Sequence, residues 1–426
     1  MGMSEEAGTE FNGYRKSDPQ AKRINLALLL AGLATFTVLY STQAILPYFA
    51  RSYGITPSHA SLSMSLATAG LGCGLLVAAP LSDRLGRTNL ILFSLFASSI
   101  IGVAVAVVPN WELFLAARFV QGTLLAGLPA TAAVYLREEI HVSYVGAATG
   151  VYVFGTTLGG LAGRIVSSGL IELSEFLTLP NLGWINFQHE HFAMLGTALL
   201  ALSCAIACKQ LLPDSRGFNP NPQSFRQLPR NFIRAFTDPV LIGLYLMAAL
   251  TMGTFVGIFN SMGFRLEAAP YYFSIGLIGL LYFVYPVGGV ASTWAGKASD
   301  LVGMRKIMPL GVTVMLVAVF VLAGEHIALI ILGLVLLSAG FFSVHSVASA
   351  WVAARASLGI RLPAQAAAMY MLFYYAGSSL SGNLTPYSYE VAGWSGVTLL
   401  TASLVGAALL ISILMYFTRP MSLPKA

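Results

Sequence analysis

Residues 26–50 read LALLLAGLATFTVLYSTQAILPYFA, an apolar run interrupted mainly by Gly, Ser and Thr. A helix needs about 20 apolar residues to cross the hydrocarbon core of a bilayer. Because lipid offers no partner for backbone N–H and C=O groups, such a run must satisfy them internally, which favours a helix. This stretch predicts a transmembrane helix, and residues 88–109, 309–323 and 396–417 share its character.

The composition of the whole chain also indicates a membrane protein. Of its 426 residues, 57% are hydrophobic and 9% are charged, whereas soluble domains carry about 25% charged residues. We attribute the net charge of +6 to basic loops that orient a membrane protein, and we expect no nucleic-acid partner. Cys73, Cys204 and Cys208 all lie in apolar runs, so neither a structural disulfide nor a metal site is expected.

Twelve spans are predicted, and the loops between them set the orientation. Lys and Arg concentrate in the segments that face the cytoplasm if the N-terminus is inside, which is the usual bias of membrane proteins. The opposite segments hold Arg51 and Arg265, with Arg164 inside or near the outer end of the fifth span. Both termini are therefore expected in the cytoplasm. The spans are expected near 24–50, 58–82, 88–108, 112–137, 143–171, 191–212, 238–264, 271–297, 305–324, 326–353, 363–389 and 394–418.

A basic, proline-containing stretch divides these spans into six and six. Two motifs support an internal repeat: Asp300 follows Asp83 by 300 − 83 = 217 residues, and Gly377 follows Gly155 by 377 − 155 = 222 residues. Paired halves with a site between them are the plan of many secondary transporters. The predicted fold is an all-α membrane protein with twelve transmembrane helices in two pseudo-symmetric six-helix bundles. Its parts are a cytoplasmic tail (1–23), a first bundle (24–212), a cytoplasmic linker (213–237), a second bundle (238–418) and a cytoplasmic tail (419–426).

Residues 79–88 read APLSDRLGRT. They resemble the loop signature Gly-x-x-x-Asp-Arg-x-Gly-Arg-Arg of the major facilitator superfamily, with Ala at the first position and Thr at the last. The resemblance extends over essentially all of residues 24–418 and is closest to the twelve-span drug and sugar efflux branch, which includes arabinose exporters. A carboxylate beside a helix start, with neighbouring Arg side chains, can hold two elements together. We expect these loops to latch the halves on the cytoplasmic side in one state, unless they are ordinary basic loops. The predicted latch is Asp83, Arg84, Gly86, Arg87, Asp300, Gly303 and Arg305.

A second motif lies in the fourth span. Residues 118–122 read RFVQG and resemble the superfamily signature Leu-x-x-x-Arg-x-x-Gln-Gly, with Phe114 at the opening position. An arginine within the membrane is costly and normally faces a partner or a cavity. We expect Arg118 and Gln43 to face the same cavity. The alternative is that Arg118 extends its guanidinium to the outer surface.

A third motif lies in the fifth span, where residues 155–160 read GTTLGG. This resembles the antiporter signature Gly-Pro-x-x-Gly-Gly, with Thr in place of Pro, and the resemblance implies export. Glycines also let helix backbones approach closely, so helix packing alone would explain them. We expect close packing at Gly155, Gly159, Gly160 and Gly377.

Polar and aromatic residues within the spans indicate a cavity with few hydrogen-bonding groups, which suits an amphipathic solute. Each tyrosine could instead be a packed residue or an anchor at the membrane interface. Because a histidine has an unperturbed pKa of about 6.5, His345 is expected to couple transport to protons together with Arg118, unless it only bonds a neighbouring carbonyl. The predicted cavity residues are Tyr40, Gln43, Arg118, Tyr152, Asn260, Tyr282, His345, Tyr374 and Tyr375.

These features predict a secondary transporter, not an enzyme. The resemblance implies proton-coupled export of small amphipathic compounds, sugars or drugs across a bacterial inner membrane, by a monomer in contact with lipid and without a cofactor or metal. The alternatives are an importer or a flippase for a lipid or lipid-linked sugar, and, less in keeping with the repeated halves, a membrane enzyme or a receptor. The chain has no Gly-x-x-x-x-Gly-Lys loop, so ATP-driven transport is not expected. Residues 172–190 are expected to cap the outer mouth or to contact a component of the cell envelope.

Overall fold

The computed structural model describes residues 11–108, 110–177, 179, 187–218, 228–360 and 362–418, and this part of the chain is almost entirely helical. The exception is an isolated parallel bridge between Tyr14 and Ile140. The first half holds α1 (Pro19–Tyr40), η1 (Gln43–Ile45), α2 (Leu46–Tyr53), α3 (Pro57–Leu85), α4 (Arg87–Val105), α5 (Trp111–Leu125), α6 (Gly127–Glu139), α7 (Val145–Ser174) and α8 (His189–Leu211). The second half holds α9 (Leu228–Ala235), α10 (Pro239–Glu267), α11 (Ile275–Leu280), η2 (Leu281–Val284), α12 (Tyr285–Val302), α13 (Met304–Val321), α14 (Ile327–Leu358) and α15 (Pro363–Tyr416).

These elements form eleven segments that are long and apolar enough to cross a membrane. Short helices join into longer spans, for example α1, η1 and α2 across Pro19–Tyr53. The last segment, α15, has 54 residues and contains non-helical backbone at Ala392 and Gly393. Since a straight helix of that length would be about 80 Å long, more than twice the hydrocarbon thickness, α15 supplies two spans. The predicted all-α fold with twelve spans in two bundles is confirmed.

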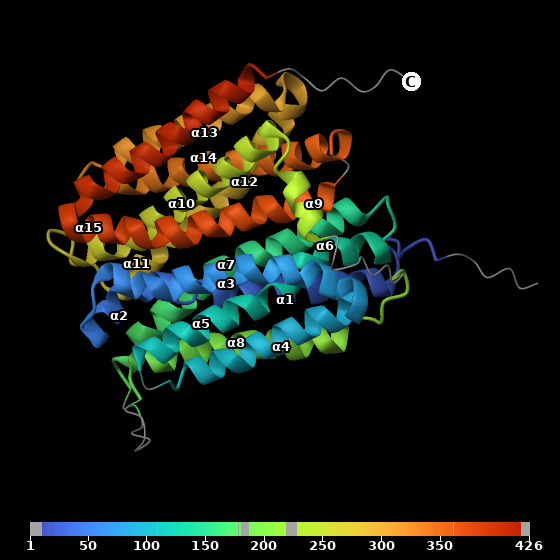
Figure 1. The fold of residues 1–426 in the computed structure, drawn as a ribbon. Coiled ribbons are helices and arrows are strands. Elements are labelled where there is room, and N and C mark those ends of the chain that lie inside the picture. The colour runs from blue at the N-terminus through green and yellow to red at the C-terminus, as the bar shows by residue number, and fades with distance from the viewer. Residues whose placement is uncertain are drawn as a thin grey trace, which may run out of the picture.

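Each half lies on its own side of the molecule (Figure 1). Helix α1 begins, and helix α15 ends, on the same side of the molecule, which we call the basic face. We call the opposite side the distal face. The predicted division at 213–237 and the predicted tails stay predictions, because 1–10, 219–227 and 419–426 lie outside the described residues. The basic face carries Arg84, Arg87, Arg137, Lys209, Arg305 and Lys306.

Glycines bring one helix pair in each half into backbone contact. A Cβ atom built on Gly155 of α7 would lie 2.4 Å from the Leu29 carbonyl oxygen of α1, and one on Gly159 would lie 2.5 Å from that of Leu33. In the second half, a Cβ atom on Gly377 of α15 would lie 2.0 Å from the Ala249 carbonyl oxygen of α10. Only residues without a side chain permit such approach. The pairs α1/α7 and α10/α15 are thus built alike.

Candidate functional site

The two halves meet in a buried polar contact near the distal face. Gln43 lies in η1, where α1 has ended, and its Nε2 donates to Oδ1 of Asn260 in α10 at 2.7 Å. Asn260 Nδ2 in turn donates to the Gly382 carbonyl oxygen of α15 at 2.8 Å. Gln43 is 2% exposed and Asn260 is fully buried. A hydrogen bond between buried amides is costly to break without a replacement, so this contact favours closure of the halves here.

Gln43 and Asn260 occupy equivalent positions of the internal repeat. They are 217 residues apart, as are Asp83 and Asp300. The same offset relates Gly86 and Gly303, whose φ angles are +89° and +93°, each between two consecutive helices. Equivalent positions of two related halves lie symmetrically about the axis that relates them. The Gln43–Asn260 hydrogen bond therefore crosses the pseudo-twofold axis of the molecule.

Arg164 of α7 extends this contact. Its Nε donates to Gln43 Oε1 at 2.7 Å, and its Nη1 donates to the Gly160 carbonyl oxygen at 2.5 Å. Three tyrosine rings surround the guanidinium, with centroids 4.0 Å (Tyr40), 4.5 Å (Tyr285) and 4.8 Å (Tyr282) from Cζ. The side chain is 1% exposed. We call Arg164 and these three tyrosines the Arg164 cage; Tyr40 comes from the first half and the other two rings from the second.

The expectation that Arg118 shares a cavity with Gln43 is wrong. Arg118 of α5 is fully buried and bonds within the first half, so the alternative that it reaches the outer surface is also wrong. Its partners are the carbonyl oxygens of Ser63 (3.1 Å), Val38 (3.1 Å) and Leu39 (2.9 Å), and Gln121 Oε1 (2.6 Å). The last carbonyls of a helix lack intrahelical donors, and α1 ends at Tyr40. Arg118 therefore donates hydrogen bonds to carbonyl oxygens that lack intrahelical donors where α1 ends.

Replacing Arg118 by Gln is expected to destabilise the folded protein strongly. A glutamine cannot span the four acceptors, and a buried acceptor left without a donor costs about 1–3 kcal/mol. The measurement is the midpoint of thermal unfolding of purified protein in detergent. Arg137→Gln is the control, since Arg137 is exposed and, among the described residues, donates to the Ala133 carbonyl oxygen of its own helix. Equal unfolding temperatures for the two variants would contradict this role of Arg118.

Arg164 was placed inside or near the outer end of the fifth span by the sequence analysis. The structure places it inside the helix of that span, α7, where it is buried at the interface between the halves. The sequence signal for this buried position was that Arg164 comes just after the glycines of the third motif. An arginine in such an apolar, glycine-rich helix needs a protein partner.

The other predicted cavity residues do not contact the Arg164 guanidinium in the described part of the chain. His345 of α14 is half-buried, and its Nδ1 lies 3.0 Å from the Tyr370 hydroxyl. Its ring lies 4.9 Å from that of Tyr374. Tyr375 contacts Gly72 of α3 across the halves, and Tyr152 is half-buried on α7. His345 contacts neither Arg118 nor Arg164 directly, so proton coupling through it stays a prediction.

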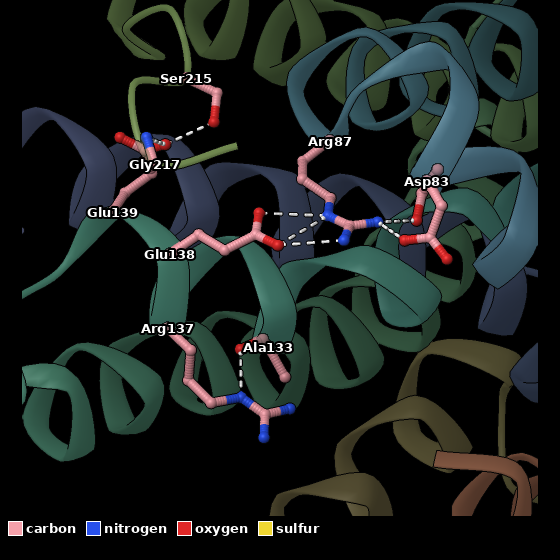
Figure 2. A network of polar contacts seen from close by, with 9 residues as sticks. Asp83, Arg87, Ala133, Arg137, Glu138, Glu139, Ser215 and Gly217 are labelled. Carbon is pink, nitrogen blue, oxygen red and sulfur yellow. Dashed lines mark hydrogen bonds and ion pairs between the residues drawn. The ribbon is translucent and has the colours of Figure 1, made fainter. Parts of the chain in front are cut away.

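The predicted latch on the basic face bonds within one half. Arg87 lies between Asp83, at 2.5 Å, and Glu138, at 3.0 Å (Figure 2). All three residues belong to the first half. In the second half, Asp300 is exposed and Arg305 donates to the Thr418 carbonyl oxygen. A latch between the halves stays a prediction, and the contacts here stabilise each half separately.

Two further contacts on the basic face escaped the sequence analysis. Glu139 accepts hydrogen bonds from the Ser215 hydroxyl and, at 2.8 Å, from the Gly217 N–H, which attaches the start of the linker to α6 (Figure 2). Arg355 of α14 pairs with Asp238 at the start of α10, with Nε and Oδ2 2.7 Å apart. The first contact joins α6 of the first half to the start of the linker, and the second lies within the second half. None of these residues belongs to the three sequence motifs.

The distal face, in contrast, joins the halves at its rim as well as at Gln43. Several side-chain hydrogen bonds and ion pairs between the halves lie toward this face. Their arrangement predicts that the halves separate only when this rim opens. Besides Gln43–Asn260, they join Arg51 with Glu267, Glu172 with the Gly276 N–H (3.0 Å), Glu390 with the Ser58 N–H, and Asn383 with the Ser58 carbonyl oxygen (2.5 Å) and the Ser61 hydroxyl (3.2 Å).

The expected cap at 172–190 lies partly outside the described residues, at 178 and 180–186. Its described ends are anchored. His189 bonds the Ser174 hydroxyl through Nδ1 at 2.8 Å, and the Gln188 N–H donates to His191 Nδ1 at 3.1 Å. Among the residues that the structure describes, no group of three His, Cys, Asp or Glu side chains is placed to hold a metal ion.

Comparison with known proteins agrees with this architecture. The family model described as Major Facilitator Superfamily matches residues 28–291. The inner membrane transport protein YnfM of Escherichia coli K12 is 35% identical over 397 residues, which cover 93% of this chain and 91% of that protein. An uncharacterised MFS-type transporter of Bacillus subtilis, YybF, is 34% identical over 96% of this chain and 97% of its own length.

Solved structures share the fold at low sequence identity. A bacterial homolog of the human lysosomal transporter Spinster, in an inward-facing and unoccupied conformation, gives a TM-score of 0.75 at 15% identity, over 94% of this chain and 97% of that one. A D-xylose–proton symporter gives a TM-score of 0.66 at 16% identity, over 92% and 96%.

Proposed function

Because the chain belongs to the Major Facilitator Superfamily and is a secondary transporter of that type, we propose that it exports a small amphipathic solute by alternating access. The basic face lies in the cytoplasm of a bacterial cell and the distal face lies outside the inner membrane. The Lys and Arg residues of the basic face support this orientation, because cytoplasmic loops carry an excess of these residues.

The single observation that carries the proposal is the buried Gln43–Asn260 hydrogen bond across the pseudo-twofold axis. It belongs to a set of contacts between the halves that gathers toward the distal face. Near that face, α11 and η2 contact α7 of the first half, whereas the main neighbours of α12 are α13 and α14 of its own half. This asymmetry is expected of a transporter that is closed outside and open to the cytoplasm. Rocking of the halves would break the distal contacts and expose the same site outside.

Proton coupling is proposed to depend on His345, which is half-buried beside Tyr370 and Tyr374. Reconstituted protein should move at least one of three probes, L-arabinose, a cationic dye or 2-naphthalenesulfonate, faster when a pH gradient is imposed. His345→Gln should lose the acceleration by the gradient while downhill transport of the probe persists. The measurement is initial uptake into proteoliposomes with and without the gradient.

His326→Gln is the matched control, because His326 precedes the same helix, α14, but is exposed at the distal face. It should behave as the unmodified protein does. An unchanged pH dependence in His345→Gln would remove His345 from the coupling mechanism. Absence of transport for all three probes in either direction would contradict the proposed function.

A further inference from the structure

Among the buried arginines of the described residues, Arg164 is the one whose aromatic partners come from both halves. Arg87 is paired with two carboxylates, and Arg118 and Arg265 bond several oxygens inside their own halves. Arg164 has two neutral oxygens, of Gln43 and Gly160, and three aromatic faces. In the described part of the chain no carboxylate forms an ion pair with it. A guanidinium offers five N–H donors in a plane that suits a carboxylate, so this cation lacks its best partner.

A buried hydroxyl lies next to the guanidinium. Tyr285 is 6% exposed, and its hydroxyl interacts with Arg164 itself and has no other hydrogen-bond partner in the described part of the chain. The centre of the same ring lies 4.5 Å from the Arg164 Cζ atom. Buried polar groups normally have partners. A cationic group and a hydroxyl at one place can together receive an anionic group.

Aromatic side chains continue from the Arg164 cage into the second half. The Tyr285 ring lies 5.3 Å from Phe255, which stacks on Phe341 at 4.3 Å. Phe341 in turn stacks on His345 at 6.0 Å. Aromatic surfaces take up flat apolar groups through offset stacking and edge contacts. We call this series of rings, from Tyr285 to His345, the aromatic wall.

We propose that the Arg164 cage binds the anionic group of an organic anion whose apolar or aromatic body lies along the aromatic wall, and that this group replaces Gln43 on the guanidinium. This substrate class rests on the transport function proposed above. A charged acceptor forms stronger hydrogen bonds with a guanidinium than a neutral amide does. Since Gln43 also holds Asn260, its displacement weakens the bond across the pseudo-twofold axis. Binding of the anion thereby promotes opening of the distal face.

The test uses aryl carboxylates, each paired with its amide, beginning with 2-naphthoate and 2-naphthamide. Purified full-length protein is expected to show a rise in unfolding temperature with the carboxylate and little with the amide. Arg164→Lys is expected to weaken the apparent affinity by about tenfold or more, as loss of a planar two-point contact implies. Arg265→Lys is the control, because Arg265 is buried near the distal face but its partners in the described part of the chain, the Leu322 and Gly324 carbonyl oxygens and the Tyr271 and Trp394 rings, all belong to its own half.

A second variant keeps the test decisive if changes at Arg164 disturb folding. Gln43→Glu places a carboxylate on the guanidinium from within the chain. Because the new carboxylate occupies the guanidinium, this variant is expected to abolish the response to 2-naphthoate. Equal responses to carboxylates and amides, no response to any carboxylate in the series, or an unchanged response in Arg164→Lys and Gln43→Glu would overturn the anion site. Transport of L-arabinose or the cationic dye in the same preparations would then leave the proposed transporter function standing.

Discussion

Leucine in place of Gly159 is expected to leave little folded protein in the membrane. A Cβ atom at this position would lie 2.5 Å from the Leu33 carbonyl oxygen and 2.8 Å from that of Gly32. Both are backbone atoms of α1, so no side chain can rotate away, and the helices must separate. Overpacking of a core costs about 1–3 kcal/mol when side chains can yield, and the cost here should exceed that range.

The matched control for this variant is Gly150→Leu in the same helix. A Cβ atom built on Gly150 meets nothing within 4 Å, so that variant should fold as the unmodified protein does. The measurement is the yield of monodisperse protein in size-exclusion chromatography, together with its unfolding temperature. Gly155→Leu is a second test, because its Cβ atom would lie 2.4 Å from the Leu29 carbonyl oxygen. If Gly159→Leu and Gly150→Leu gave equal yields, close α1/α7 packing would not be required for folding.

The membrane spans could be predicted from sequence because the bilayer imposes a simple physical requirement. In each apolar run of sufficient length, the backbone N–H and C=O groups must hydrogen-bond within the run. Basic or polar loops separate these runs. Hydropathy alone did not define the boundary between the last two spans. The last two spans, predicted at 363–389 and 394–418, form one helical element, α15, whose backbone departs from helical geometry only at Ala392 and Gly393.

The partners of the two buried arginines could not be predicted in the same way. Sequence gives the depth of Arg118 and Arg164 in the membrane, but their direction depends on how each helix is rotated against its neighbours. Arg118 turns toward the interrupted end of α1 inside the first half. Arg164 turns toward the interface and bonds Gln43, the residue with which Arg118 was expected to share a cavity. Packing between helices decides this rotation, and a single sequence does not contain it.

The Gln43–Asn260 pair, however, could have been predicted from the sequence. Both residues were predicted to line the cavity, and the repeat offset of the loop motif, 217 residues, maps one onto the other. Equivalent residues of two symmetric halves approach each other only near the axis that relates them. A polar pair at the repeat offset is therefore a signal for contacts across the pseudo-twofold axis.

A cross-link across the distal rim is expected to abolish transport reversibly. Arg51 of α2 and Glu267 of α10 form an ion pair between the halves at this face. If the halves rock about a shared site, this contact must break in every cycle. Cysteines at both positions, joined by a bifunctional methanethiosulfonate reagent, should reduce transport nearly to the level of empty liposomes. Reduction of the linkage should restore it, because the folded protein is otherwise unchanged.

The cross-linking experiment needs a thiol background and a control pair that lies in one half. Cys73 is exposed, whereas Cys204 and Cys208 are buried, so Cys73→Ser is the appropriate background. Cysteines at Tyr271 and Glu325 supply the control, since the Tyr271 hydroxyl contacts the Glu325 carbonyl oxygen within the second half. Linking that pair should leave transport intact, because both ends move together. Undiminished transport by protein linked between positions 51 and 267 would mean that the distal contacts stay closed during turnover, which alternating access does not allow.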